Sequence, residues 1–262
     1  MNIIKNILKK NPCYKNGKTI TVKGITLHSI GTPQPKAKAV ADYWNQSNMN
    51  VCVHAIIDGL TGDVIQTLPW NYRAWHCGSG SKGSYNNDHI GVEMCEPDCI
   101  KYKSGATFTC SDKKRAKEIA KRTYNTAVEL FAKLCTDYKL NPLKDGVIVS
   151  HHEGHERGYA SGHADPEHLW TQLGLSYTMN GFRKDVAKKM GIDEPEPEKK
   201  KFPYMVRVTA KSLNVREGAG TEYKITCAIG ENESYTIIEE LDGWGKLLSG
   251  AGWINLKYTE KV

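Results

Sequence analysis

A break in composition near residue 200 constrains the fold of this chain more than any other feature. Residues 191–203 read Gly-Ile-Asp-Glu-Pro-Glu-Pro-Glu-Lys-Lys-Lys-Phe-Pro. Prolines set among alternating charges favour an extended, semi-rigid spacer that cannot build a core. The sequence therefore predicts two modules, residues 1–190 and 204–262, joined by a linker at 191–203.

Charge is distributed unevenly between the two modules. The net charge of the chain is +7, and residues 1–191 carry 26 Lys and Arg against 17 Asp and Glu, a balance of +9. Residues 201–262 carry eight of each sign. A basic first module favours a polyanionic partner, either nucleic acid or an anionic cell-wall polymer.

No segment has the sequence of a membrane span or of a secretory signal. Because no run of 18 apolar residues occurs, we expect neither a transmembrane helix nor membrane insertion. Residues 1–10 lack the continuous apolar core and the small-residue cleavage site of a signal peptide. We therefore expect a protein that stays in the cytoplasm until another factor releases it.

Eight cysteines are present, and they form no CxxC pair. A structural zinc knuckle is therefore not expected. Without a signal peptide, free and mostly buried thiols are the expected state, and a disulfide formed after release is the alternative.

The first module is predicted to be α/β, with helices packed on a mixed sheet. Its strand candidates are rich in Val, Ile and Thr. Its longest helix candidate, residues 112–138 with Ser111 as N-cap, keeps apolar residues at helical spacing. The strand candidates are residues 19–28, 51–58, 64–68, 89–95 and 146–150, and shorter helices are expected at 36–46 and 181–190.

The second module is predicted to be all-β. Short alternating runs at residues 205–208, 235–239, 245–248 and 252–254 are separated by Gly, Asn and Asp turns. At this strand density, about 60 residues suit a small β-barrel.

Imidazole and carboxylate side chains cluster directly after the apolar run 146–149. Residues 149–168 read Val-Ser-His-His-Glu-Gly-His-Glu-Arg-Gly-Tyr-Ala-Ser-Gly-His-Ala-Asp-Pro-Glu-His, and His28 also ends a strand candidate. Deprotonated nitrogen and oxygen donors at a strand end are what a zinc site needs. If the two strand ends adjoin, His28 and a histidine of the 151–155 cluster can share one metal with a loop carboxylate such as Asp165. Three protein ligands would leave a fourth position for water, as in catalytic sites.

Six short motifs follow one another within residues 15–175. They are Ile25-Thr-Leu-His28-Ser, Val53-His-Ala-Ile-Ile-Asp58, Ala74-Trp-His-Cys-Gly78, Ile90-Gly-Val-Glu93, Val149-Ser-His151 and His163-Ala-Asp-Pro166. In this order and spacing they resemble the type 2 zinc N-acetylmuramoyl-L-alanine amidases. That family includes phage endolysins, bacterial autolysins and, more distantly, the peptidoglycan-recognition proteins of animals.

The resemblance implies Zn²⁺ as cofactor and assigns roles to five residues. His28, His151 and Asp165 become the zinc ligands, with His152 as the rival of His151, because side chains alternate along an extended segment. Glu93 becomes the general base, and His163 stabilises the developing oxyanion as a cation or a hydrogen-bond donor. The bond that the family hydrolyses is the amide between the lactyl group of N-acetylmuramic acid and L-alanine.

Other residues near these motifs have alternative assignments. Trp75, His76 and His54 are expected at the substrate cleft, with a structural role as the alternative. Glu96 competes with Glu93 for the acid–base role, but strand alternation turns it to the opposite face unless the chain bends. The remaining histidines, His89, His155 and His168, are expected at the surface or behind the site.

Glycine- and tryptophan-containing motifs mark the second module. Residues 213–223 carry an Asn-Val-Arg…Gly…Gly-Thr pattern, and residues 250–255 carry Gly-Trp-Ile. These motifs resemble bacterial SH3-like cell-wall-binding domains, which implies peptidoglycan as partner. Tyr223, Trp244 and Trp253 are the expected binding residues, with a place in the barrel core as the alternative. Such tethering raises the effective concentration of an enzyme at an insoluble substrate.

Together the two resemblances predict a monomeric endolysin or autolysin acting on the wall of a Gram-positive host. A phage endolysin that waits in the host cytoplasm for holin-type permeabilisation accounts for the missing signal. The alternatives are a zinc cell-wall endopeptidase, which would release different products, and a non-catalytic peptidoglycan-binding protein. Nucleic-acid binding accounts for the basic charge but not for the metal-ligand pattern, so no nucleic-acid partner is expected.

Overall fold

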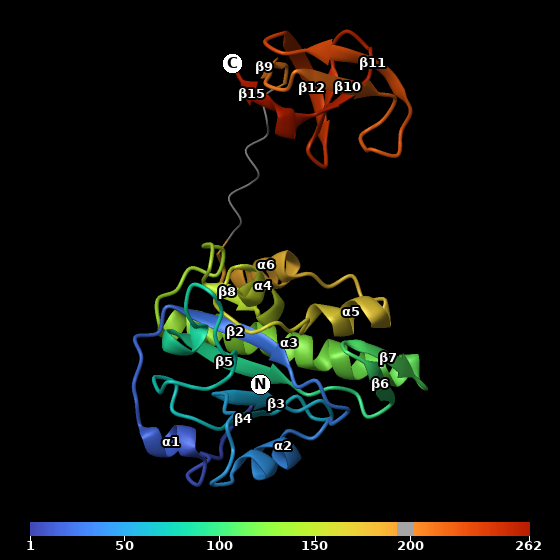
Figure 1. The fold of residues 1–262 in the computed structure, drawn as a ribbon. Coiled ribbons are helices and arrows are strands. Elements are labelled where there is room, and N and C mark those ends of the chain that lie inside the picture. Colours follow the sequence, from blue (N-terminus) through green and yellow to red (C-terminus); the bar gives the residue numbers. More distant parts are fainter. Residues whose placement is uncertain (193–201) are drawn as a thin grey trace. The chain divides into compact units, whose positions relative to one another are not determined.

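A computed structural model describes residues 1–192 and 202–262 of the chain (Figure 1). The chain divides into two units, Met1–Glu194 and Pro195–Val262, and each has a hydrophobic core of its own. The boundary falls within the range predicted as a linker, of which residues 193–201 lie outside the described residues.

Six strands form the central sheet of the first unit, in the order β1-β4-β3-β5-β2-β8. β5 pairs in parallel with β3 and β2, whereas β3 and β4 are antiparallel, so the sheet is mixed as predicted. The strands are β1 (Ile3–Lys5), β2 (Gly24–Ser29), β3 (Ala55–Ile57), β4 (Val64–Gln66), β5 (His89–Met94) and β8 (Ile148–Ser150).

Helices pack on this sheet, and the longest of them, α3, covers one face. Its apolar side joins Ile90 and Val92 of β5 in the main hydrophobic cluster. The helix begins one residue later than predicted, because the side chain of Asp112, not Ser111, accepts the N–H of Arg115. The helices are α1 (Pro12–Asn16), α2 (Ala37–Trp44), α3 (Lys113–Asp137), α4 (His151–Glu156), α5 (Glu167–Leu173) and α6 (Met179–Lys189).

Alternation along the central strands separates an apolar face from a polar one. Ile25 and Leu27 of β2 lie in the cluster beneath α3, so His28 points to the other face. On β5, Val92 lies in the same cluster, and Glu93 points away from it. The parallel register pairs His28 with Glu93. The sheet thus places an imidazole and a carboxylate beside each other, away from the apolar core.

A separate two-stranded hairpin, which the sequence patterns do not predict, follows β5. It consists of β6 (Ile100–Ser104) and β7 (Thr107–Cys110). Phe108 of the hairpin packs with Leu169 and Leu173 of α5 in a small cluster. The side chain of Gln172 also bonds to the backbone of the hairpin at Phe108 and Ala106. The hairpin is therefore fixed against α5.

The second unit is all-β, as predicted, and forms one antiparallel sheet of seven strands in the order β11-β10-β14-β13-β12-β9-β15. Apolar side chains from β9, β10, β11, β12, β13 and β14 share a single core. The strands are β9 (Tyr204–Val208), β10 (Ser212–Arg216), β11 (Ile225–Gly230), β12 (Ser234–Leu241), β13 (Trp244–Leu247), β14 (Trp253–Asn255) and β15 (Thr259–Lys261).

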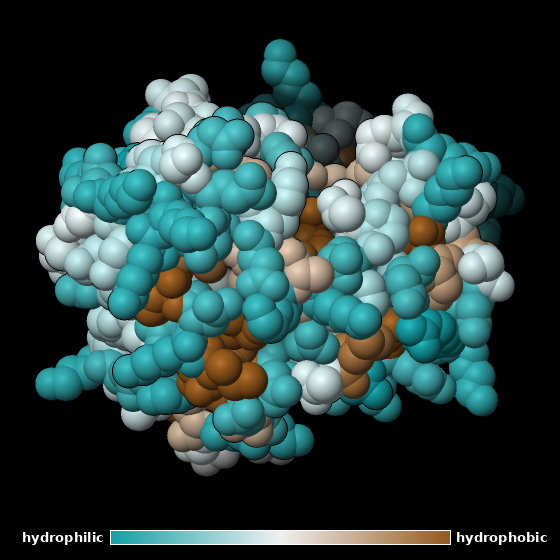
Figure 2. Space-filling view, turned by 90° about the horizontal axis from the view of Figure 1, so that it is seen from below, coloured by the Kyte–Doolittle hydropathy of each residue, from teal (hydrophilic) through white to brown (hydrophobic). Residues whose placement is uncertain are grey.

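Hydrophilic residues cover most of the face that Figure 2 presents, and the apolar patches between them are separate. In the part of the chain that the structure describes, no helix combines the length and the apolar character that crossing a membrane requires. The longest helix, α3, has its buried apolar residues on one side only.

Candidate metal centre

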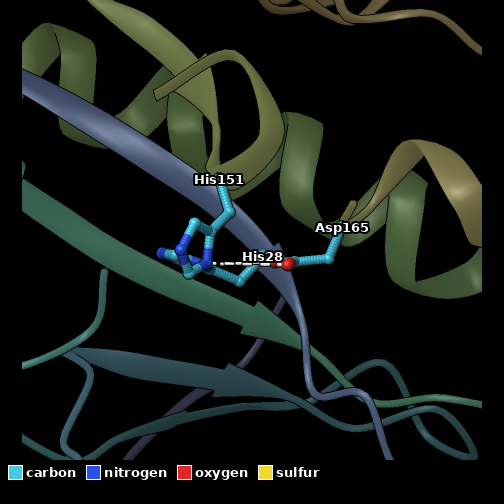
Figure 3. A group of neighbouring side chains, drawn as sticks. All are labelled: His28, His151 and Asp165. Atoms are coloured by element: carbon cyan, nitrogen blue, oxygen red, sulfur yellow. Dashed lines mark hydrogen bonds and ion pairs between the residues drawn. The ribbon is translucent and has the colours of Figure 1, made fainter. Parts of the chain in front are cut away.

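His28, His151 and Asp165 turn their side chains toward one point (Figure 3). His28 Nδ1 lies 3.1 Å from His151 Nδ1 and 3.2 Å from Asp165 Oδ2. His151 Nδ1 lies 3.5 Å from Asp165 Oδ1. The edges of a tetrahedron of N and O ligands around zinc measure about 3.3–3.6 Å, because each ligand lies about 2.0–2.2 Å from the ion. The three donors lie at this spacing or slightly inside it, so the set fits a zinc ion after a small outward shift.

Outer hydrogen bonds orient both imidazoles toward this point. Ser161 Oγ donates to the carbonyl oxygen of Cys77 and so accepts from His151 Nε2, 3.2 Å away. This arrangement leaves His151 Nδ1 with its lone pair facing the other donors. His28 Nε2 lies 2.9 Å from His76 Nδ1. A hydrogen bond from His28 to His76 likewise leaves His28 Nδ1 with its lone pair facing the other donors. Such partners are typical of metal-binding histidines.

The electrostatics of the group favour the protonation states that bind a metal. Burial lowers the pKa of His28, which keeps its imidazole neutral. Burial alone would raise the pKa of Asp165, but its close contacts with His151 and His28 outweigh burial and hold that pKa well below its usual range. A neutral imidazole and an ionised carboxylate are the forms in which these side chains ligate metals.

The start of α4 determines which histidine of the cluster reaches the site. Ser150 accepts the backbone N–H of Glu153, and the Glu153 side chain accepts the N–H of Ser150, so the two residues form a capping box. His151 is thus the first residue of a helix rather than part of an extended segment. Its side chain is 5% exposed, whereas that of His152 is 43% exposed and faces Glu156. The Ser-x-x-Glu pattern was the sequence signal for this helix, and it was missed.

Replacing Ser150 by Ala should lower the free energy of unfolding by about 0.5–2 kcal/mol, because α4 loses its N-cap. Urea denaturation followed by circular dichroism measures this change. Thr178→Ala is the matched control, since Thr178 caps α6 away from the site. Both variants should lose stability, and only Ser150→Ala should also weaken zinc binding. Equal zinc binding in the two variants would contradict this role of the cap.

A cleft of about 830 Å³ opens at the site, and two of the three ligands, His151 and Asp165, line it. Glu93 lines it and is only 8% exposed. Its Oε2 has no hydrogen-bond partner within residues 1–192 and 202–262. Burial, then the charges of Asp165 and Glu96, raise the pKa of Glu93 well above its usual range. The other lining residues include Trp44, His76, Tyr102, His155, His163 and His168.

His163 lies at the mouth of the cleft, where its ring stacks on that of His151 with centroids 4.3 Å apart. Its Nδ1 lies 3.7 Å from Asp165 Oδ1, and its side chain is 57% exposed. Burial and then the charge of His151 lower the pKa of His163, which favours a neutral ring near pH 7. His163 therefore has the form of a hydrogen-bond donor rather than of a fixed cation.

The structure places only His76 of the three expected substrate contacts at the cleft. His54 is fully buried, and both of its ring nitrogens bond to backbone groups, Nε2 to the Tyr72 carbonyl and Nδ1 to the Gly91 N–H. Trp75 pairs through its backbone with Cys52 and packs on the cluster beneath α2. His54 and Trp75 therefore have structural roles and do not line the cleft.

Glu96 does not share the cleft with Glu93. It is fully buried, accepts hydrogen bonds from Ser29 Oγ and the Gly31 N–H, and is also hydrogen-bonded to the hydroxyl of Tyr102. Burial raises its pKa to about 7. Sequence reasoning missed Tyr102 altogether, because the hairpin that carries it shows no clear strand pattern.

Comparison with known proteins places these residues in a family. The sequence profile of the N-acetylmuramoyl-L-alanine amidases matches residues 18–168. The amidase CwlA of Bacillus subtilis is 29% identical over 96 residues, which are 36% of this chain and 34% of CwlA. The amidase XlyA of the same organism is 31% identical over 98 residues, 37% of this chain and 32% of XlyA. These matches span about a third of the length of each relative.

Solved structures show the same fold. AmiA, a hydrolase of Staphylococcus aureus, superimposes with a TM-score of 0.54 at 21% identity, over 74% of this chain and 88% of the AmiA chain. The catalytic domain of PlyG superimposes with a TM-score of 0.51 at 21% identity, over 75% of this chain and 99% of that domain. With a profile that matches more than half of its residues, the chain belongs to the N-acetylmuramoyl-L-alanine amidase family.

Proposed function

We propose that this protein is a zinc-dependent peptidoglycan hydrolase that cleaves the amide between N-acetylmuramic acid and L-alanine. One observation carries the proposal. In a chain of this family, His28, His151 and Asp165 converge on one point, and a buried glutamate, Glu93, faces the same cleft. Such a site has the parts that metal-assisted amide hydrolysis needs.

The three ligands would hold the ion, and Glu93 would move the proton. Bound zinc would supply an activated water near neutral pH and a positive charge facing the scissile carbonyl. With the ion bound, its positive charge would favour the ionised form of Glu93, whose unpartnered Oε2 could then accept the proton of the attacking water. The same carboxyl group then delivers this proton to the nitrogen of the departing L-alanine.

His163 would complete the site from the mouth of the cleft. A neutral imidazole there can donate one N–H to the oxygen on which negative charge develops. Its stacking on His151 holds the ring in position. His76 also lines the cleft, and its contact with His28 Nε2 orients that ligand.

We propose that the second unit binds the wall as an SH3-like domain. A groove of about 430 Å³ on this unit is lined by Trp244, Tyr258, Asn255 and Arg216.

Of the residues expected to bind, Trp244 thus lines the groove, although it is only 8% exposed. Trp253 is partly buried beside Lys246, and Tyr223 is 46% exposed. An aromatic floor with amide and guanidinium groups suits peptidoglycan peptides or sugars.

Replacing Tyr258 by Ala should weaken retention on purified cell walls by at least about fivefold, since an interface aromatic commonly contributes 1 kcal/mol or more. Tyr258 is 46% exposed, so the substitution leaves the core intact. Sedimentation of the full chain with walls measures retention. Leu241→Ala is the control, because Leu241 is 52% exposed in the same unit. Equal losses in both variants would show that the groove is not the binding site.

The narrower proposal is a monomeric phage endolysin that acts on the wall of a Gram-positive host. The +9 balance of residues 1–191 supports it, because a basic surface concentrates the enzyme on an anionic wall polymer. Protein added from outside should lyse Gram-positive cells. Protein produced inside such cells should lyse them only after the membrane has been permeabilised.

Digestion of purified peptidoglycan tests the proposed function. The products should carry new L-alanine N-termini and no new reducing sugars. A new N-terminus at another amino acid would instead indicate an endopeptidase. Binding without any cleavage would indicate a non-catalytic recognition protein.

A further inference from the structure

A run of hydrogen bonds that takes no part in the proposed chemistry begins beside one metal ligand. Ser29 directly follows His28 on β2. Its hydroxyl donates to Glu96 Oε1 over 2.7 Å, and the hydroxyl of Tyr102 lies 2.8 Å from Glu96 Oε2. The carboxylate of Glu96 thus joins the end of β2 to the β6–β7 hairpin.

The run continues from the hairpin to a second metal ligand. The hydroxyl of Tyr102 lies 2.7 Å from His168 Nε2, and His168 Nδ1 lies 3.3 Å from the carbonyl oxygen of Ala164. Ala164 directly precedes Asp165. The hydrogen bonds from Ser29 to Ala164, here named the strut, therefore connect the neighbours of two ligands that are 137 residues apart in the sequence.

The middle of the strut is buried and internally satisfied. Glu96 is fully buried and also accepts the backbone N–H of Gly31 over 3.1 Å. Three hydrogen-bond partners therefore fix its carboxyl group, and the loss of one leaves a buried polar atom without a partner. The strut is rigid for that reason.

The donor and acceptor pattern makes Tyr102 the essential bridge. A carbonyl oxygen only accepts, so His168 Nδ1 carries the hydrogen that faces Ala164. His168 Nε2 then either accepts from the Tyr102 hydroxyl or donates to it. In the first case Glu96 donates to Tyr102, and in the second Glu96 accepts from it. In both cases the one oxygen of Tyr102 connects the two side chains.

We propose that Glu96, Tyr102 and His168 are positioning residues that hold Asp165 at the distance from His28 that tight zinc binding requires. Asp165 lies between α4 and α5, outside both helices, so its spacing from β2 depends on such contacts. The proposal rests on the proposed function only in taking zinc as the ion. Loss of an outer hydrogen bond of a metal site typically weakens metal affinity by about 10- to 100-fold.

The test is the Zn²⁺ affinity of the full chain, measured by competition with a chromophoric chelator. Tyr102→Phe removes one hydroxyl and should weaken Zn²⁺ affinity by about tenfold. Tyr124→Phe is the matched control, because Tyr124 also donates to a carboxylate, Asp185, over 2.7 Å, but between α3 and α6. Both variants should lower the melting temperature, whereas Tyr124→Phe should keep the wild-type Zn²⁺ affinity.

Glu96→Gln supplies the conservative rescue. The Gln oxygen accepts from Ser29 and Gly31, and its amide donates to Tyr102, which donates to His168. This variant should therefore bind Zn²⁺ with nearly the wild-type affinity.

Equal affinity in Tyr102→Phe and the wild type, or a loss in Glu96→Gln as large as in Tyr102→Phe, would overturn the strut alone. A wild-type protein that binds no Zn²⁺ would overturn the proposed function as well.

Discussion

Glu93→Gln should lower kcat/KM on muramoyl-peptide substrates by roughly 10²–10⁴-fold, the range that general acid–base catalysis contributes. Gln has the size and shape of the protonated glutamate but cannot take a proton from water. Because burial already favours the uncharged form of Glu93, the amide should be tolerated and the fold unchanged. Steady-state kinetics together with zinc content measures the effect.

Zinc content separates the catalytic loss from a structural one. The variant should retain as much zinc as the wild type, since Glu93 is not one of the three converging donors. Asp185→Asn is a suitable control, because Asp185 lies on α6 and bonds to Tyr124 rather than facing the cleft. A wild-type kcat/KM in Glu93→Gln would show that Glu93 is not the general base, and His163 would then be the next residue to test.

His151→Ala should abolish both zinc retention and hydrolysis. Removing one of three ligands should weaken zinc binding by more than the roughly 10- to 100-fold that loss of an outer partner brings. Without the ion, the pKa of water stays far above the value of about 7 that bound zinc can bring, so almost no nucleophile forms at neutral pH. Elemental analysis after dialysis and an activity assay on purified walls measure the two effects.

The neighbouring histidine provides a control within the same helix. His152→Ala changes the same residue type one position along α4, where the side chain is 43% exposed. It should keep zinc and activity near wild-type levels. Treatment of the wild type with a chelator should reproduce the loss seen in His151→Ala, and added zinc should restore only the wild type. The opposite ranking of the two variants would make His152 the ligand.

Five of the six strands of the central sheet were predictable from the sequence, because they are short, rich in β-branched residues and separated by turn residues, whereas β1 was not predicted. The places of His28 on β2 and of Glu93 on β5, both on the face away from α3, follow from simple alternation. The ordered motifs then supplied the partners from distant segments, His151 and Asp165, which periodicity alone cannot bring together. The site was thus predictable where local pattern and motif order agree.

Other features depend on tertiary contacts that no local pattern reveals. His54 was expected at the cleft, yet its position between the Tyr72 carbonyl and the Gly91 N–H is set by backbone groups of two other segments. The β6–β7 hairpin packs through only one strongly apolar residue per strand, Ile100 and Phe108, so its pattern is weak. Tyr102 and the strut were missed for the same reason.

The most direct test of the central claim is hydrolysis of a muramoyl-tripeptide in water enriched in ¹⁸O, followed by mass spectrometry of both products. The account predicts one ¹⁸O atom in the lactyl carboxylate of N-acetylmuramic acid and a free L-alanine amine on an unlabelled peptide. Zinc removal should prevent this reaction. An ¹⁸O atom in the carboxylate of L-alanine, with the muramoyl amide intact, would contradict the account and show that the site cleaves the peptide instead.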